Sequence, residues 1–128
     1  MITLETLNDA REYARLHELV FNQPPPIIPA VVTVGRNDRG DIVGFVSGFW
    51  NSDDGFYIQW VGLLPEYQRS GYLRYYRLLL SDSVTYDTAV RNTNIVALKT
   101  TLSIGFIPIG VIQQDNKLYV QLKREKHG

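Results

Sequence analysis

The sequence contains no cysteine and only two histidines. Without cysteine the chain has no disulfide framework, no thiolate metal site and no thiol nucleophile. The histidines, His17 and His127, stand far apart in the sequence and are too few for a zinc site of the usual kind. We therefore expect no metal site.

The chain also lacks an excess of charge of either sign, because 13 Lys and Arg residues balance 13 Asp and Glu residues. A net charge of zero gives no global electrostatic support to nucleic-acid binding. No apolar run approaches the length of a membrane span, and the N-terminal MITLETLNDAR does not resemble a signal peptide. We expect no nucleic-acid partner, no membrane association and a cytoplasmic location.

Core-forming residues are present in ordinary amount, since 45% of the 128 residues are hydrophobic and 20% are charged. This length and composition predict a single domain over residues 1–128. The first segments expected are a strand at Ile2–Thr6 and a helix capped by Asn8 or Asp9. Apolar residues recur along one face of that helix: Tyr13, Leu16 and Val20. His17 lies beside this face, and we expect it to be a half-exposed helix residue without a catalytic role.

Prolines interrupt the chain at 24–26 and 29, which forbids a helix and predicts an extended connection. Strands are then predicted at Ala30–Arg36 and Asp41–Trp50, joined by a polar turn. Three glycines are predicted to mark bulges or close backbone approaches: Gly44, Gly48 and Gly62.

The central stretch is a strand, a turn and a helix. Phe56–Leu64 is almost continuously apolar, which predicts a strand covered on both faces, and Pro65 ends it. A polar turn with Gly71 follows, and then a helix in which apolar residues recur as far as Leu80. The free N–H groups of a first helical turn suit a phosphate, and arginines lie beside this one. The turn by itself is also compatible with an ordinary strand–helix connection.

The second half of the chain predicts a strand at Val84–Val90 and a helix capped around Asn94. Gly105 is the expected C-cap of that helix. Two further strands, Phe106–Gln113 and Leu118–Leu122, are predicted to form a closing hairpin with its turn at 115–116.

Two runs of residues carry a family resemblance. Leu63-x-Pro65-x-x-Gln68-Arg69-x-Gly71-Tyr72 resembles the central motif of the GNAT superfamily of N-acetyltransferases, V-x-P-x-x-Q/R-x-x-G-x-G/A. About thirty residues later, Asn94-x-x-Ala97 followed by Gly105-Phe106 resembles the family's N-x-x-A-x-x-x-Y-x-x-x-G-F signature. The likeness covers roughly residues 43–110.

The resemblance implies an α/β (α+β) fold, with a mixed, mostly antiparallel central sheet of about six or seven strands and about three flanking helices. It also implies acetyl-coenzyme A as co-substrate, with its pyrophosphate on the backbone of the turn. The residues that would bind it, carried over from the family motifs, are Val61, Gly62, Leu63, Gln68, Arg69, Ser70, Gly71, Tyr72, Leu73, Arg74 and Asn94.

The implied reaction is transfer of an acetyl group to an amine that attacks the thioester directly. A backbone N–H near Leu63 would polarise the carbonyl. Thr101 stands where the family places the tyrosine that protonates the departing thiolate, and Tyr86 is a second hydroxyl. The central strand contains no carboxylate to act as base, because Tyr57 and Gln59 occupy the candidate positions.

The sequence leaves two functions open. The first is an N-acetyltransferase acting on a small amine or a protein amine, and the intact Gln68, Gly71 and Asn94 favour it. The second is a catalytically inactive protein of the same fold that binds acyl-coenzyme A or another protein. Leu73, where the family has Gly or Ala, and Thr101 favour the second. The sequence leaves a homodimer open in either case.

Overall fold

The computed structural model describes residues 1–127, which contain seven β-strands, three α-helices and one 3-10 helix. In chain order these are β1 (Thr3–Thr6), α1 (Ala10–Phe21), β2 (Val31–Arg36), β3 (Ile42–Trp50), β4 (Gly55–Leu63), η1 (Pro65–Tyr67), α2 (Tyr72–Leu78), β5 (Thr85–Arg91), α3 (Ile95–Ser103), β6 (Ile107–Gln114) and β7 (Lys117–Arg124). The strands are hydrogen-bonded in the order β1-β2-β3-β4-β5-β7-β6. The pair β4–β5 is parallel, whereas β1–β2, β2–β3, β5–β7 and β6–β7 are antiparallel. The predicted mixed, mostly antiparallel sheet with three helices is confirmed.

The chain forms two compact units. The first unit comprises Met1–Phe49 and Gln59–Leu80, and the second comprises Trp50–Ile58 and the chain from Ser81 onward. Strand β4 therefore gives its first four residues to the second unit and its remainder to the first.

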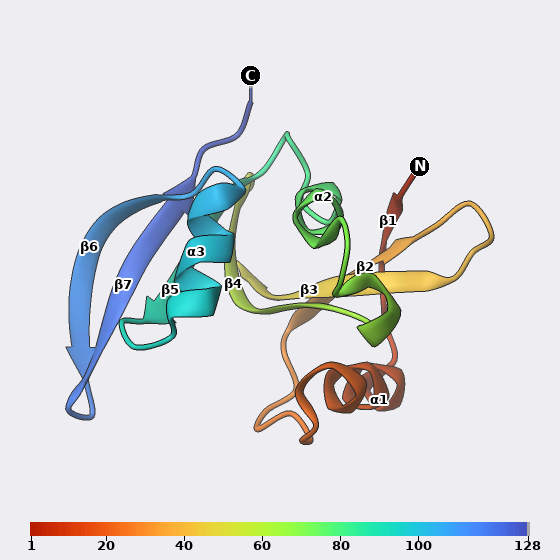
Figure 1. Ribbon diagram of the computed structural model, residues 1–128, viewed down its shortest axis with the longest axis horizontal. Coiled ribbons are helices and arrows are strands. Elements are labelled where there is room, and N and C mark those ends of the chain that lie inside the picture. Colours follow the sequence, from red (N-terminus) through yellow and green to blue (C-terminus); the bar gives the residue numbers. More distant parts are fainter. Residues whose placement is uncertain (128) are drawn as a thin grey trace. The chain divides into compact units, whose positions relative to one another are not determined.

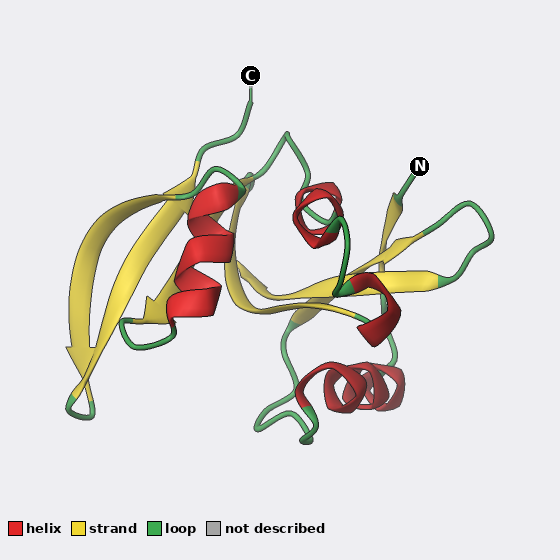
Figure 2. Ribbon diagram, viewed as in Figure 1, coloured by secondary structure: helices red, strands yellow, loops and turns green. Residues whose placement is uncertain are grey.

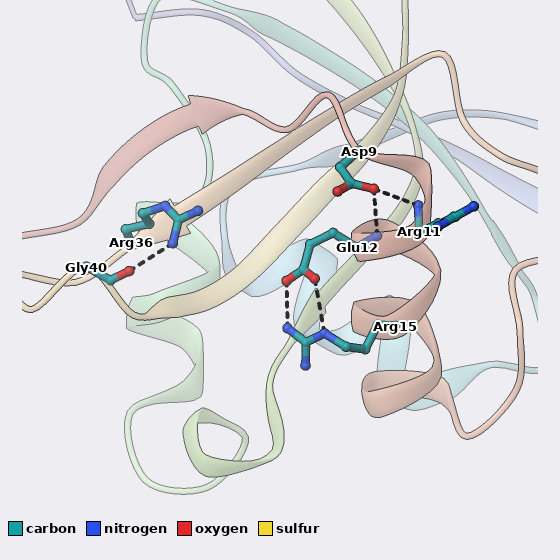
Figure 3. Close-up of polar contacts among 6 residues, drawn as sticks. All are labelled: Asp9, Arg11, Glu12, Arg15, Arg36 and Gly40. Atoms are coloured by element: carbon teal, nitrogen blue, oxygen red, sulfur yellow. Dashed lines mark hydrogen bonds and ion pairs between the residues drawn. The ribbon is translucent and has the colours of Figure 1, made fainter.

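In the first unit, helix α1 begins where the sequence supplies a cap. The Asp9 carboxylate accepts hydrogen bonds from the backbone N–H groups of Arg11 and Glu12 at 3.0 and 3.2 Å (Figure 3). These bonds satisfy donors that have no partner inside the helix. On the exposed side of the same helix the Arg15 guanidinium pairs with Glu12, with an Nη2–Oε1 distance of 2.6 Å, and this hydrogen bond lowers the pKa of Glu12 (Figure 3).

The core of the first unit forms where α1 covers the strands. Its buried residues are Tyr13, Leu16, Val32, Val34 and Phe45. Helices α1 and α2 lie on opposite sides of β2 and β3 (Figure 1). Helix α2 ends at Leu78, earlier than the sequence predicted, because the next residues turn in 3-10 fashion. The N–H of Leu80 donates to the carbonyl of Arg77 at 3.2 Å, although Leu80 itself is buried.

Two of the three marked glycines in the strands lie at close approaches, as predicted. A Cβ atom at Gly44 would lie 2.4 Å from the carbonyl oxygen of Gly62, and one at Gly62 would lie 2.6 Å from Cγ1 of Val20 in α1. Larger residues would push the helix and the strands apart. The proline-rich connection between α1 and β2 contains no helix and is drawn as a loop in Figure 2.

One expectation about the first unit is wrong. His17 is not half-exposed: only 1% of its surface is accessible. Its ring packs against aromatic neighbours, with centroids 4.7 Å from Phe21 and 5.3 Å from Trp60. The buried face of α1 is therefore wider than the apolar pattern suggests. The hydroxyl of Tyr13, one turn earlier, hydrogen-bonds the imidazole, and this bond offsets the cost of burying a polar ring.

In the second unit, β5, β7 and β6 form an antiparallel ladder, and α3 links β5 to β6 (Figure 2). The β6–β7 hairpin turns at Asp115 and Asn116, which both adopt left-handed backbone angles with φ of 52° and 61°. Such angles match the twist of a two-residue hairpin, and Asp and Asn tolerate them. Gly105 follows α3 with φ of 103°, as expected of a residue that ends a helix.

Candidate functional site

The turn between β4 and α2, in the first unit, is built to expose backbone N–H groups. After η1, the Gln68 side chain folds back and its Nε2 donates to the Leu63 carbonyl at 2.8 Å, which ties the turn to the end of β4. Gly71 then adopts φ of 81°, and α2 starts at the next residue. Positive φ is costly for side chains with a Cβ, so the glycine is needed here.

Within residues 1–127, the backbone N–H groups of Arg69, Ser70 and Gly71 donate to no acceptor. All three residues are exposed, so the turn is accessible to solvent. Consecutive free N–H groups in a turn of this kind form a concave donor site for anions. Arg69 and Arg74 are also exposed and add positive charge in the same segment. The turn is therefore suited to a phosphate-bearing ligand, and binding of the co-substrate there stays a prediction.

Leu73 is half-buried in the first turn of α2. Helix α2 has only seven residues, so its dipole adds little and the turn relies on its free N–H groups and arginines.

Residues of β4 predicted to contact the co-substrate are less accessible. Gly62 and Leu63 are buried and Val61 is half-buried, so any contact from them would come through backbone atoms.

The predicted residues of the second unit each have a local structural partner. The Asn94 Oδ1 accepts from the Ala97 backbone N–H at 3.2 Å, which makes Asn94 the N-cap of α3. The Thr101 hydroxyl donates to the Ala97 carbonyl at 2.7 Å, one turn earlier in the same helix. A hydroxyl that donates to a carbonyl of its own helix does not at the same time donate to a ligand.

Tyr86 is buried, and its phenol oxygen accepts from the Ser81 backbone N–H at 2.9 Å. Burial raises the pKa of Tyr86, with smaller opposing effects from the Ser81 hydrogen bond and Arg124. A raised pKa makes the phenol a weaker acid. These contacts favour structural roles for Tyr86 and Thr101, and their catalytic roles stay predictions.

A buried polar chain in the first unit was not foreseen from the sequence. His17 Nδ1 lies 3.0 Å from the Tyr13 hydroxyl, which lies 3.1 Å from the Ser47 hydroxyl. Ser47 Oγ in turn donates to the Trp60 carbonyl in β4 at 3.3 Å. A carbonyl oxygen only accepts, so the single O–H of Ser47 is donated to Trp60. The Tyr13 hydroxyl must then donate to Ser47, and Nδ1 of His17 must donate to Tyr13. In this arrangement Nδ1 of His17 carries a proton, and burial lowers the pKa of the imidazole below its ordinary value.

Asp87 is a second residue that sequence reasoning missed. It lies within β5, paired with Tyr57 of β4 in the parallel ladder. A carboxylate inside a β-rich segment is a signal that could have been noticed. Its partner, however, lies thirty positions earlier in the sequence, so no local spacing reveals the pair.

No protein-family model matches the sequence, and the comparison with curated proteins found no match. Solved structures match over almost the whole chain. A spermidine N-acetyltransferase SpeG chimera from Vibrio cholerae and hSSAT is 14% identical, with a TM-score of 0.70, and the match covers 98% of this chain and 96% of that one. Naa50 from Arabidopsis thaliana, in complex with the bisubstrate analogue CoA-Ac-MVNAL, is 15% identical at a TM-score of 0.67, covering 97% and 98%.

The ribosomal-protein-S18-alanine N-acetyltransferase from Escherichia coli is 14% identical at a TM-score of 0.63, covering 100% of this chain and 96% of that chain. The chain has the GNAT fold. At these identities the likeness is one of fold. Among residues 1–127 of this GNAT-fold chain, no helix is long and apolar enough to cross a membrane. The same residues contain no cluster of three or more His, Cys, Asp or Glu side chains suited to a metal ion.

Proposed function

We propose that this GNAT-fold chain is an N-acetyltransferase that transfers an acetyl group from acetyl-coenzyme A to an amine. The observation that carries the proposal is the turn at Gln68–Arg74, where three consecutive backbone N–H groups have no acceptor within residues 1–127 and two arginines belong to the same segment. The fold adds support, because structures with this fold include a spermidine N-acetyltransferase and a complex with a coenzyme A bisubstrate analogue. The proposed domain is the whole chain.

In the proposed reaction the neutral amine attacks the thioester carbonyl carbon. A C–N bond forms, the C–S bond breaks, the nitrogen loses a proton, and the departing thiolate gains one to become free coenzyme A. The chain's own contribution is to hold the co-substrate by the turn and to orient it. Positioning of two reactants alone supplies about 7–11 kcal/mol in well-oriented systems, so such a reaction tolerates weak acid and base groups.

A second candidate is an inactive protein that binds acyl-coenzyme A or another protein. The observation in its favour concerns Thr101, which stands at the position of the family's acid. Its hydroxyl donates a hydrogen bond to the Ala97 carbonyl. The half-buried Leu73 in the turn also favours weaker co-substrate binding. A small amine or a protein amine as acceptor and a cytoplasmic location stay predictions, and a homodimer stays open.

Binding is tested by calorimetry with acetyl-coenzyme A and a matched pair of variants. Gly71→Asp and Gly71→Asn add side chains of similar size at φ of 81°, a conformation that both tolerate better than other residues. They differ in charge, so Gly71→Asp should abolish binding and Gly71→Asn should only weaken it.

Gly40→Asp serves as the control for backbone strain, because Gly40 has φ of 85° and a Cβ atom added there would meet nothing within 4 Å. It should bind acetyl-coenzyme A like the unaltered chain. Equal affinity of folded Gly71→Asp and the unaltered protein would overturn the assignment of the turn. Release of free thiol in the presence of amines then separates the enzyme from the inactive protein.

A further inference from the structure

A row of polar side chains crosses one face of the sheet in the second unit. Tyr57 of β4 pairs with Asp87 of β5, and Asp87 pairs with Lys123 of β7. Residues directly opposite each other in a ladder project from the same face. Two positions further along β5, Ala89 pairs with Gln121, so these side chains belong to that face as well.

A pocket of about 210 Å³ lies at this row. It is lined by Asn51, Tyr57, Asp87, Thr88, Ala89, Ile109, Gln121 and Leu122. Pockets for drug-sized ligands measure about 300–1,000 Å³. This one has room for a single side chain or a small molecule. Its wall combines aliphatic groups with one carboxylate, that of Asp87.

The Asp87 carboxylate is held loosely by its neighbours. Its Oδ2 accepts from Asn51 Nδ2 at 3.3 Å, and its Oδ1 lies 4.0 Å from Lys123 Nζ. Hydrogen bonds between ionised groups are normally about 2.7–2.9 Å long. The Asp87 side chain is nevertheless only 25% exposed, so water solvates the charge incompletely. A cation that entered the pocket could approach the carboxylate more closely than Lys123 does.

Tyr57 adds a second recognition element. It is half-buried, and burial together with the negative charge of Asp87 raises its pKa. The phenol therefore stays protonated and neutral at ordinary pH. Aromatic rings attract cations, and a phenol oxygen accepts a hydrogen bond from an ammonium group.

We propose that the pocket at Tyr57 and Asp87 binds a primary alkylammonium group. A single carboxylate suits one monovalent cation, and the aliphatic groups of Ala89 and Ile109 suit a short hydrocarbon stem. Binding of the ammonium stands on the pocket alone. Its assignment to the acceptor of acetyl transfer rests on the proposed function.

The test is an NMR titration of the ¹⁵N-labelled full chain with n-butylammonium chloride at neutral pH and low salt, without acetyl-coenzyme A. We expect saturable shifts of the backbone signals of Asp87, Ala89 and Gln121. 1-Butanol, which has the same stem and no charge, should cause little or no shift. Equal binding of the alcohol, or no saturable shift with the amine, would overturn the proposal.

Two variants should change the affinity in opposite directions. Asp87→Asn removes the charge and should weaken binding at least tenfold, whereas Lys123→Gln removes the competing ammonium group and should strengthen binding. Asp53→Asn, an exposed carboxylate in a turn of the same unit, is the matched control and should leave binding unchanged. If Asp87→Asn does not fold, the Lys123→Gln result decides, since unchanged or weaker binding would contradict competition for the carboxylate.

A kinetic arm connects the pocket to the acceptor. With n-butylamine as acceptor, Asp87→Asn should raise the KM for the amine at least tenfold and leave the KM for acetyl-coenzyme A unchanged. If the unaltered chain binds the amine and releases no thiol, the proposed function fails and the pocket stands. If thiol is released and Asp87→Asn has the KM of the unaltered chain, the assignment to the acceptor fails and the proposed function stands.

Discussion

Replacing Tyr13 by phenylalanine should destabilise the first unit far more than the loss of one hydroxyl at the surface. The Tyr13 hydroxyl joins His17 Nδ1 at 3.0 Å and Ser47 Oγ at 3.1 Å, and all three residues are at most 1% exposed. Ser47 keeps its bond to the Trp60 carbonyl, so it loses one partner of two. His17 loses the only partner that Nδ1 has in the chain of hydrogen bonds described above.

The magnitude follows from these two losses. A buried group left without a partner costs about 1–3 kcal/mol, and a lost bond whose donor finds another partner costs about 0.5–1.5 kcal/mol. We expect Tyr13→Phe to lower the free energy of unfolding by about 2–4 kcal/mol. Since the unfolding entropy is about 2.1 cal/mol/K per residue, a chain of 128 residues should lose about 4 °C in Tm for each kcal/mol. The expected fall in Tm is therefore on the order of 10 °C.

The assay is urea unfolding followed by circular dichroism, with Tyr72→Phe as the control because Tyr72 is 40% exposed. The control should stay within about 0.5 kcal/mol of the unaltered chain. A double-mutant cycle with Ser47→Ala should show a coupling energy of about 0.5–3 kcal/mol, as for directly bonded pairs. If Tyr13→Phe behaved like Tyr72→Phe, or the cycle showed no coupling, the buried chain of hydrogen bonds would be refuted.

Three further predictions concern pH, affinity and rate. Burial lowers the pKa of His17 from its ordinary value of 6.5, so the unfolded chain binds a proton first and stability should fall as the pH drops below about 6.5. Urea unfolding from pH 7.5 to 5 should show a weaker fall in stability for His17→Gln than for the unaltered chain. If both proteins lost the same stability over this range, groups other than His17 would cause the loss. Leu73→Gly should bind acetyl-coenzyme A more tightly in calorimetry while costing about 1 kcal/mol of stability, and weaker binding by the folded variant would show that Leu73 packs usefully. If thiolate departure limits the rate, Thr101→Tyr should raise thiol release about tenfold, because a phenol is a far better proton donor than an alcohol; Thr101→Val, which also loses the bond to Ala97, is the control and should show no gain.

The caps and turns could be predicted from the sequence because their hydrogen bonds close within a few residues. The Asp9 carboxylate reaches the N–H groups two and three positions ahead, and Asn94 reaches Ala97 in the same way. The hairpin turn at Asp115 and Asn116 depends on the backbone preferences of those two residues. Gly71 likewise indicated a turn, because glycine adopts positive φ at little cost.

The geometry of the turn at Gln68–Arg74 was predictable for the same reason, since it is formed by one continuous segment. The bond from Gln68 to Leu63 spans only five positions. What the sequence did not show was how short α2 is, because the apolar spacing continues to Leu80 while the hydrogen bonds tighten after Leu78.

The sequence by itself determined the local elements, the caps and the glycine turn between β4 and α2. Only the tertiary structure decided which polar groups are buried and which meet across the sheet. His17 becomes a core residue because Ser47, thirty positions away from it, completes the chain of bonds through Tyr13. Asp87 becomes a candidate ligand group because strand pairing sets it beside Tyr57 and Lys123. Both depend on the register between distant segments, which is fixed by the packing of the whole unit and by no short run of residues.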